Sequence, residues 1–168
     1  MTIDLTTYLT IGATVIALIA VIISGWTAWM QRQHNKLSFS PFPEIQLRDM
    51  NGQVRVQISN NGTGPLIIQT LAIKRSNEIV GKTLIELMPP NGQWSFFVHE
   101  VDGRSIKPAG DIILLDLNYN PQNLQELDFA NQTRKSLCPL EIEITYKNIY
   151  NDVLPIYKKS LTWFSRLI

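Results

Sequence analysis

Residues 8–30 form the longest apolar stretch of the chain, and they include no charged side chain. At about 1.5 Å of rise per helical residue, they are long enough to cross a hydrocarbon layer of about 30 Å. Their polar members are hydroxyl residues, whose side chains can bond the helix backbone inside lipid. These residues are Thr10, Thr14, Ser24 and Thr27. The pattern therefore predicts one membrane-spanning helix.

The flanks of this helix differ from those of a cleaved signal peptide. The N-terminal flank holds Asp4 and no basic residue, and the far end carries tryptophans in place of a small-residue cleavage site. Aromatic residues gather at membrane interfaces, and basic residues stay on the cytoplasmic side. We therefore predict an uncleaved span, with residues 1–7 outside the cytoplasm and the C-terminal domain inside it. The predicted membrane-interface residues are Tyr8, Trp26, Trp29, Arg32 and Lys36.

Small side chains recur along the predicted span at intervals of three and four residues, which places them on one helix face. They are Ala13, Ala17, Ala20, Ser24 and Ala28. Such a stripe allows two helices to approach closely in lipid, so one interpretation is a self-association face. The other interpretation is the ordinary frequency of small residues in membrane helices. The sequence leaves both open.

After the span, residues 31–43 comprise a polar collar and a proline-containing spacer, because Pro41 and Pro43 favour an extended chain. Residues 44–49 and 53–59 then alternate between apolar and polar positions. Asn51-Gly52 between them is a strong hairpin signal. The second segment is predicted to turn Val54, Val56 and Ile58 inward and Gln53, Arg55, Gln57 and Ser59 toward water.

Turn signals divide the remaining chain into short elements. The predicted strands are residues 66–75, 94–98, 112–117, 140–146 and 153–159. Residues 80–88 suit one or two helical turns. Asn120-Pro121 predicts the cap and first position of a short helix that ends by Asn131. We therefore predict a mainly β fold over residues 44–168, an immunoglobulin-like antiparallel sandwich or a small barrel, after a single N-terminal transmembrane helix.

Charge and cysteine usage narrow the function classes. The chain has 15 basic and 14 acidic residues, and those outside Asp4, Arg32 and Lys36 balance. A neutral domain lacks the electrostatic footprint of a general nucleic-acid binder. The single cysteine, Cys138, excludes an internal disulfide and is predicted to be a small buried side chain. Two histidines far from Cys138 provide no metal-ligand spacing, so we predict no metal and no cofactor.

Four segments are weighed for chemistry. His99, Glu100 and Asp102 contain acid/base groups, but they suit a solvated hairpin tip better. Residues 60–65 resemble a phosphate-binding loop only loosely, and a connection between sheets is the better interpretation. Glu141 and Glu143 share a strand face. The simpler interpretation is a face exposed to solvent, and the alternative is a catalytic pair of carboxylates. The tail, residues 161–168, suits either a lipid surface or an end strand packed on the sandwich. No catalytic residue is predicted.

Three short motifs resemble a group of small bacterial and prophage single-pass membrane proteins. They are His34-Asn35-Lys36-Leu37-Ser38, the loop Asn60-Asn61-Gly62-Thr63-Gly64-Pro65, and the strand end Ile144-Thr145-Tyr146. In that group a membrane helix precedes a basic segment and a β-sandwich-like domain. The resemblance implies the architecture and a bacterial inner membrane, and it implies no activity.

The leading functional hypothesis is a non-enzymatic, membrane-tethered interaction or sensor module. Its predicted partners are the lipid bilayer and either a second copy or another protein, with no nucleic acid. One alternative is an effector of an antiviral defence system, in which clustering of the cytosolic domain makes the helices breach the membrane. An enzyme of unknown type is the other alternative, and it would need a polar pocket. The sequence identifies no small-molecule ligand.

Overall fold

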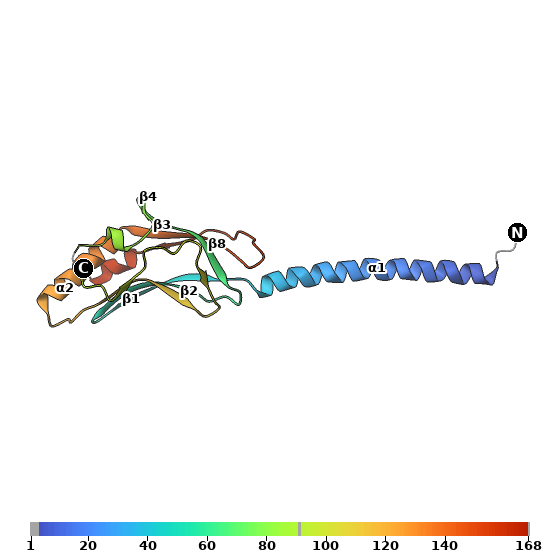
Figure 1. The fold of residues 1–168 in the computed structure, drawn as a ribbon, viewed down its shortest axis with the longest axis horizontal. Helices are drawn as coiled ribbons and strands as arrows, with labels where there is room; N and C mark the ends of the chain where they lie inside the picture. Colours follow the sequence, from blue (N-terminus) through green and yellow to red (C-terminus); the bar gives the residue numbers. More distant parts are fainter. Residues whose placement is uncertain (1–3, 91, 168) are drawn as a thin grey trace. The chain divides into compact units, whose positions relative to one another are not determined.

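The computed structural model describes residues 4–90 and 92–167, in two units. The first ends at Ser38, and the second, the body, begins at Phe39. The first unit is one long helix and the body is rich in β-structure (Figure 1).

Helix α1, Leu5–Ser38, has 34 residues and no buried side chain. Asp4 precedes it; the Asp4 carbonyl oxygen accepts from the Thr7 amide at 2.9 Å, and the Asp4 Oδ1 accepts from the Leu5 amide at 3.1 Å. The helix continues through most of the predicted collar and stops before Pro41 and Pro43. It is long and apolar enough to cross a membrane, with a mean hydropathy of 2.2 in its most apolar window.

The first sheet has the strand order β1-β2-β7-β5, and each neighbouring pair is antiparallel. Its strands are β1 (Pro43–Met50), β2 (Gln53–Asn60), β5 (Phe96–Phe97) and β7 (Asp111–Asn118). The Asn51-Gly52 hairpin is confirmed, since Met50 pairs with Gln53 and Gly52 takes a φ of +92°. Glycine suits this turn because it adopts positive φ without a Cβ clash.

The second sheet has the order β4-β3-β8-β9, with β6 beside β3, and it is also antiparallel. Its strands are β3 (Leu66–Arg75), β4 (Glu78–Gly81), β6 (Ser105–Ile106), β8 (Leu140–Lys147) and β9 (Tyr157–Ser160). In the part of the chain that the structure describes, the strands form two sheets in a sandwich-like arrangement. This outcome favours the sandwich over the small barrel.

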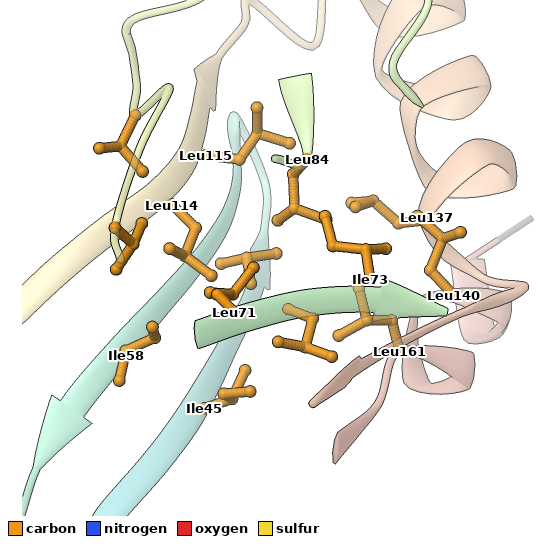
Figure 2. Close-up of a cluster of buried hydrophobic side chains, with 14 of the residues drawn as sticks. Ile45, Ile58, Leu71, Ile73, Leu84, Leu114, Leu115, Leu137, Leu140 and Leu161 are labelled. Carbon is orange, nitrogen blue, oxygen red and sulfur yellow. The ribbon is translucent and has the colours of Figure 1, made fainter. Parts of the chain in front are cut away.

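The core lies between the two sheets (Figure 2). Val54, Val56 and Ile58 of β2 are fully buried, as predicted, and Ile142 and Ile144 of β8 are fully buried as well. The period of two residues therefore identified the inward faces of both strands correctly. The outward prediction failed for Gln57 and Ser59, which are buried. Gln57 Nε2 donates to Gln46 Oε1 at 3.0 Å, so neighbouring polar side chains take the place of water.

Helix α2, Leu124–Leu137, begins later and ends later than predicted. Asn123 is the cap in place of Asn120, because its Oδ1 accepts from the Gln125 amide at 3.0 Å. Asn120 Oδ1 accepts instead from Gln122 in the preceding turn. The helix continues past Asn131, and Leu137 at its end is fully buried. Tertiary packing, and not local helix propensity, therefore stabilises this last part of the helix.

Other elements also depart from prediction. Residues 80–88 contain the end of β4 and the short 3-10 helix η1 (Ile85–Leu87), and the predicted strand 94–98 shrinks to β5. The tail forms a second 3-10 helix, η2 (Thr162–Leu167), and not a strand. Within it Phe164 is fully buried, so its aromatic ring packs on the body. Cys138 is half-buried at the end of α2, not buried as predicted.

The outer face of the second sheet carries Glu143 between two lysines. Its Oε2 lies 2.7 Å from Lys74 Nζ and 2.9 Å from Lys158 Nζ. Hydrogen bonds from Lys74 and then Lys158 hold the pKa of Glu143 below its ordinary value. With a depressed folded-state pKa, the stabilisation is present above the unfolded-state pKa of about 4.3 and is lost as pH falls through the lower folded-state value.

The Glu143→Gln variant is therefore expected to lower the free energy of unfolding by about 1 kcal/mol at neutral pH. The difference from the wild type should begin to shrink as the pH falls below about 4.3, and it should vanish below the lower folded-state pKa, where the native carboxylate is also neutral. Urea unfolding of the detergent-solubilised full chain at several pH values measures this difference. Glu78→Gln, at an exposed hairpin position, is the control. A difference that stays constant with pH would contradict the assignment.

Candidate functional site

The candidate site is α1 together with its attachment to the body. Every side chain of the helix over residues 8–30 is exposed in the structure, including its large apolar residues. The four hydroxyl groups of this segment each donate to the carbonyl oxygen four residues earlier, at 2.7–2.8 Å. These polar groups are thereby satisfied within the helix, as a bilayer requires.

The predicted interface residues all lie on this one helix. The Trp26 and Trp29 rings are 5.7 Å apart, which gives the C-terminal end of the apolar segment a compact aromatic pair. Arg32 and Lys36 follow on the same continuous helix, about one and two turns beyond Trp29. Tyr8 lies near the other end and is exposed. Contact with lipid stays a prediction for all five residues.

The small residues Ala13, Ala17, Ala20, Ser24 and Ala28 lie in one helix, so their spacing places them along one face. Ser24 Oγ donates to the Ala20 carbonyl oxygen at 2.7 Å, which occupies its proton within the helix. A second helix on this face would therefore associate mainly through van der Waals packing, and not through a hydrogen bond donated by Ser24. Self-association stays a prediction.

The attachment, here called the junction, comprises residues 39–42 and the loop of residues 60–65. The Asn61 amide donates to the Phe42 carbonyl oxygen at 2.8 Å, and the amides of Thr63 and Gly64 donate to the Ser40 carbonyl oxygen at 3.2 and 3.3 Å. Residues 39–42, which follow α1 in the chain, are therefore hydrogen-bonded into the body. The sequence predicted an extended spacer here and missed these bonds.

Asn60 holds the junction together from inside the body. Its side chain is fully buried, and its Nδ2 donates to the carbonyl oxygens of Gly64 at 2.8 Å and Ile106 at 3.0 Å. Its Oδ1 accepts from the amides of Phe42 at 3.2 Å and Gly62 at 3.0 Å. One amide side chain thus satisfies backbone groups from three separate segments, which fixes their relative position.

The two glycines of the loop are required by close backbone approach. A Cβ at Gly64 would lie 1.9 Å from the Phe39 carbonyl oxygen, and a Cβ at Gly62 would lie 2.4 Å from the Ser40 carbonyl oxygen. No side chain fits at either distance. As predicted, the loop connects the two sheets, from β2 to β3. The sequence did not predict that the loop also contacts residues 39–42. Gly62 and Gly64 were the sequence feature that could have indicated this close approach.

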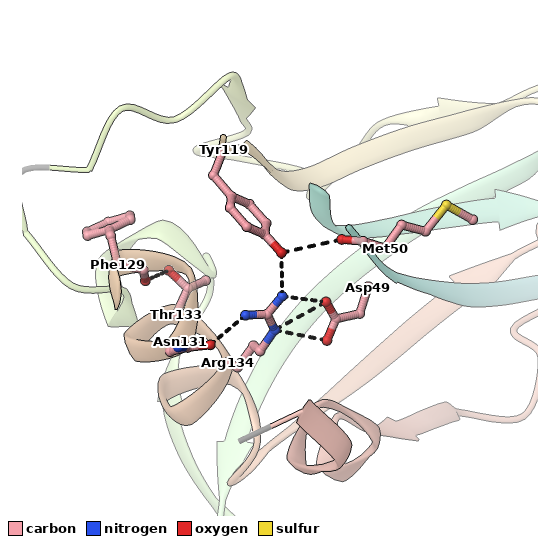
Figure 3. A network of polar contacts seen from close by, with 7 residues as sticks. All are labelled: Asp49, Met50, Tyr119, Phe129, Asn131, Thr133 and Arg134. Atoms are coloured by element: carbon pink, nitrogen blue, oxygen red, sulfur yellow. Dashed lines mark hydrogen bonds and ion pairs between the residues drawn. The ribbon is translucent and has the colours of Figure 1, made fainter. Parts of the chain in front are cut away.

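A buried ionic network is the second polar feature that sequence reasoning missed (Figure 3). Arg134 of α2 and Asp49 of β1 have side chains that are 4% and 2% exposed, and Arg134 Nη2 lies 2.8 Å from Asp49 Oδ1. The guanidinium also donates to Tyr119 Oη at 2.8 Å and Asn131 Oδ1 at 2.7 Å. Burial opposes its charged form, but the hydrogen bonds to Asp49 and Tyr119 outweigh burial and raise the pKa of Arg134.

These contacts give the network a structural role. Arg134 donates through all three of its nitrogens to protein acceptors, and Asp49 accepts with both carboxylate oxygens. The network ties α2 to the end of β1, which explains why a charged residue sits in the buried face of the helix.

The segments weighed for chemistry are occupied in structural contacts. Asp102 Oδ1 accepts from the Leu71 amide at 2.7 Å, and its other oxygen lies 3.6 Å from Lys82 Nζ. The His99 ring packs against Phe97 with centroids 5.0 Å apart. Glu143 is paired with lysines, as described above. Within residues 4–90 and 92–167, no group of three His, Cys, Asp or Glu residues could hold a metal ion.

A hollow of about 360 Å³ lies beside the N-terminal part of α2. Its lining includes Gln93, Asn118, Glu126 and Phe129. These groups offer amides, one carboxylate and an aromatic ring, a set that could hydrogen-bond a ligand but forms no nucleophile–base pair. No family model matches the chain, and no curated protein matches it significantly.

Proposed function

We propose that this protein is a non-enzymatic tether that holds an interaction domain at a bacterial inner membrane. The observation that carries the proposal is α1, an uninterrupted apolar helix with no buried side chain. An exposed apolar surface of this length is costly in water and favourable in lipid. The body, whose finer class we propose to be immunoglobulin-like, would face the cytoplasm and bind a protein partner or a second copy.

The hydrogen bonds of the junction are consistent with an ordered attachment of the body and not with a flexible linker. Four hydrogen bonds hold residues 39–42 to the 60–65 loop, one of them to the Asn60 side chain, so the first residues after α1 belong to the body's own structure.

Membrane fractionation of the full-length chain tests the anchor. We expect the protein to stay with the membrane through high-salt and alkaline washes. Replacing Leu18 and Ile22 by Arg should release it, because a charged residue at the bilayer centre costs roughly 2.5–3.5 kcal/mol on insertion scales. Met50→Arg, at an exposed position of the body, is the matched control and should leave retention unchanged. Release of the wild-type chain by the alkaline wash would contradict the proposal.

Crosslinking in mild detergent tests self-association. Ala17→Leu or Ser24→Leu should weaken oligomers severalfold, because the larger side chains keep the helix backbones apart. Val15→Leu is the control, since it adds volume about half a turn away from the stripe. Unchanged oligomers in the Ala17→Leu and Ser24→Leu variants would eliminate the stripe as a contact face.

A further inference from the structure

The loop between β8 and β9 presents apolar side chains to solvent. Ile149, Val153 and Ile156 are 49%, 68% and 51% exposed. Neighbouring Leu154, in contrast, packs against the core. The loop is itself ordered, because Asn148 Oδ1 accepts from the amides of Tyr150 at 2.9 Å and Asp152 at 3.0 Å. A fixed loop that holds large aliphatic groups outward is a recognised feature of an interaction surface.

This loop lies at the end of the body where the chain enters from α1. Lys147, the last residue of β8, pairs with Ile67 at the start of β3. Strand β3 follows directly after Gly64, whose amide bonds the Ser40 carbonyl oxygen in the junction. Phe39 and Phe42 of the junction are exposed as well. Junction and loop thus share one end of the body, here called the proximal end.

Charged residues of both signs lie near this end of the body, and two basic residues precede it in the chain. Lys147 begins the loop, and Arg104 and Lys107 flank β6, whose residues pair with Leu66 and Ile67. Glu44 near the start of β1, Asp111 and Asp152 are acidic residues at the same strand ends, so the charges of the body balance there. Arg32 and Lys36 precede the junction on α1. Exposed aliphatic side chains, in a chain whose preceding segment carries two basic groups, match the chemistry of an anionic lipid surface.

Chain length limits how far the proximal end can be from the membrane. Only residues 31–38 separate the predicted span from the junction, and they are helical. At about 1.5 Å per residue they extend no more than about 12 Å, whatever angle the helix takes. The headgroup layer itself covers about 5–8 Å of that distance. The proximal end is therefore confined to the neighbourhood of the lipid headgroups.

We propose that the proximal end of the body rests on the anionic headgroup surface, with Ile149 and Val153 inserted at its boundary. This inference rests on the proposed membrane anchor. It gives the loop a function of its own: lipid contact would fix the orientation of the body and leave the opposite end, with the β1–β2 hairpin, turned toward the cytoplasm. The apolar side chains supply burial and the basic groups supply attraction to the anionic surface.

Depth-dependent quenching of two matched reporters tests the proposal. Val153→Cys and Met50→Cys are each made in full-length protein carrying Cys138→Ala, and each is labelled with an environment-sensitive fluorophore. Met50 is 62% exposed and lies at the opposite end of β1, so it matches Val153 in exposure and differs in position. The proteins are reconstituted in vesicles of phosphatidylcholine and phosphatidylglycerol containing headgroup-nitroxide lipid. We expect quenching at position 153 to exceed that at position 50 by at least about twofold.

Each other outcome overturns the inference in a recognisable way. Equal quenching at both positions, with the protein retained by the vesicles, would reject lipid contact and leave the membrane anchor intact. Loss of the protein from vesicles after an alkaline wash would reject the anchor and the inference together. Self-quenching at position 153 that rises with the protein-to-lipid ratio, without nitroxide quenching, would assign the surface to a second copy.

Discussion

Replacing Arg134 by methionine is expected to lower the free energy of unfolding of the body by about 3–5 kcal/mol. The substitution leaves Asp49 with a side chain that is 2% exposed and without its guanidinium partner. It also removes donors from Tyr119 Oη and Asn131 Oδ1, both of which accept from Arg134 in the wild type. A buried carboxylate without a partner keeps its full desolvation cost, which is why the effect exceeds that of a surface pair.

Urea unfolding of the full-length protein in mild detergent, followed by tryptophan fluorescence, measures this loss. The double variant Arg134→Met with Asp49→Leu is expected to recover most of the stability, because it removes both charges from the interior. Arg55→Met is the control, since Arg55 is a more exposed member of a comparable pair with Asp116. If Arg134→Met lowers the free energy of unfolding no more than Arg55→Met does, burial of the Arg134–Asp49 pair does not determine its contribution to stability.

The Gly64→Ala variant is expected to destabilise the body by about 3 kcal/mol and to loosen the junction. Its Cβ would lie 1.9 Å from the Phe39 carbonyl oxygen and 2.5 Å from the carbonyl carbon. Both atoms belong to the backbone, so a side-chain rotation cannot relieve the clash. Either residues 39–42 move away and lose their hydrogen bonds to the loop, or the loop itself opens.

Limited proteolysis distinguishes a loosened junction from a general loss of stability. Chymotrypsin should cleave after Phe39 sooner in Gly64→Ala than in the wild type, because cleavage requires the chain to leave its folded conformation. Gly81→Ala is the matched control, since its Cβ would meet no atom closer than 3.7 Å. Equal unfolding free energies and equal cleavage for Gly64→Ala and Gly81→Ala would contradict the close approach described for the junction.

The strands of the body illustrate which features local sequence can predict. The alternation in β2 identified Val54, Val56 and Ile58 as core residues, because the faces of a strand repeat every two residues whatever the strand pairs with. The Asn51-Gly52 hairpin was equally local, since the turn needs positive φ at a glycine. Gln57 was misassigned because its burial depends on Gln46 of the neighbouring strand.

Helix α2 illustrates the opposite case. The sequence predicted the helix start at Asn120-Pro121, because asparagine suits the cap and proline suits the first helical position. The structure uses Asn123, and it extends the helix to Leu137 because that residue and Arg134 are buried against the body. Burial of this face depends on strands far away in the chain. For this reason the predicted helix was too early and too short.

The sequence by itself determined the apolar helix, the inward faces of the main strands and the connection between sheets at residues 60–65. These features follow from composition, from a repeat of two residues, and from turn chemistry, all of which act between near neighbours. Only the tertiary structure decided the junction and the Arg134–Asp49 pair, whose members are 85 residues apart. The reason is physical: a backbone approach too close for a Cβ, or a charge pair shielded from water, exists only after distant segments have packed together.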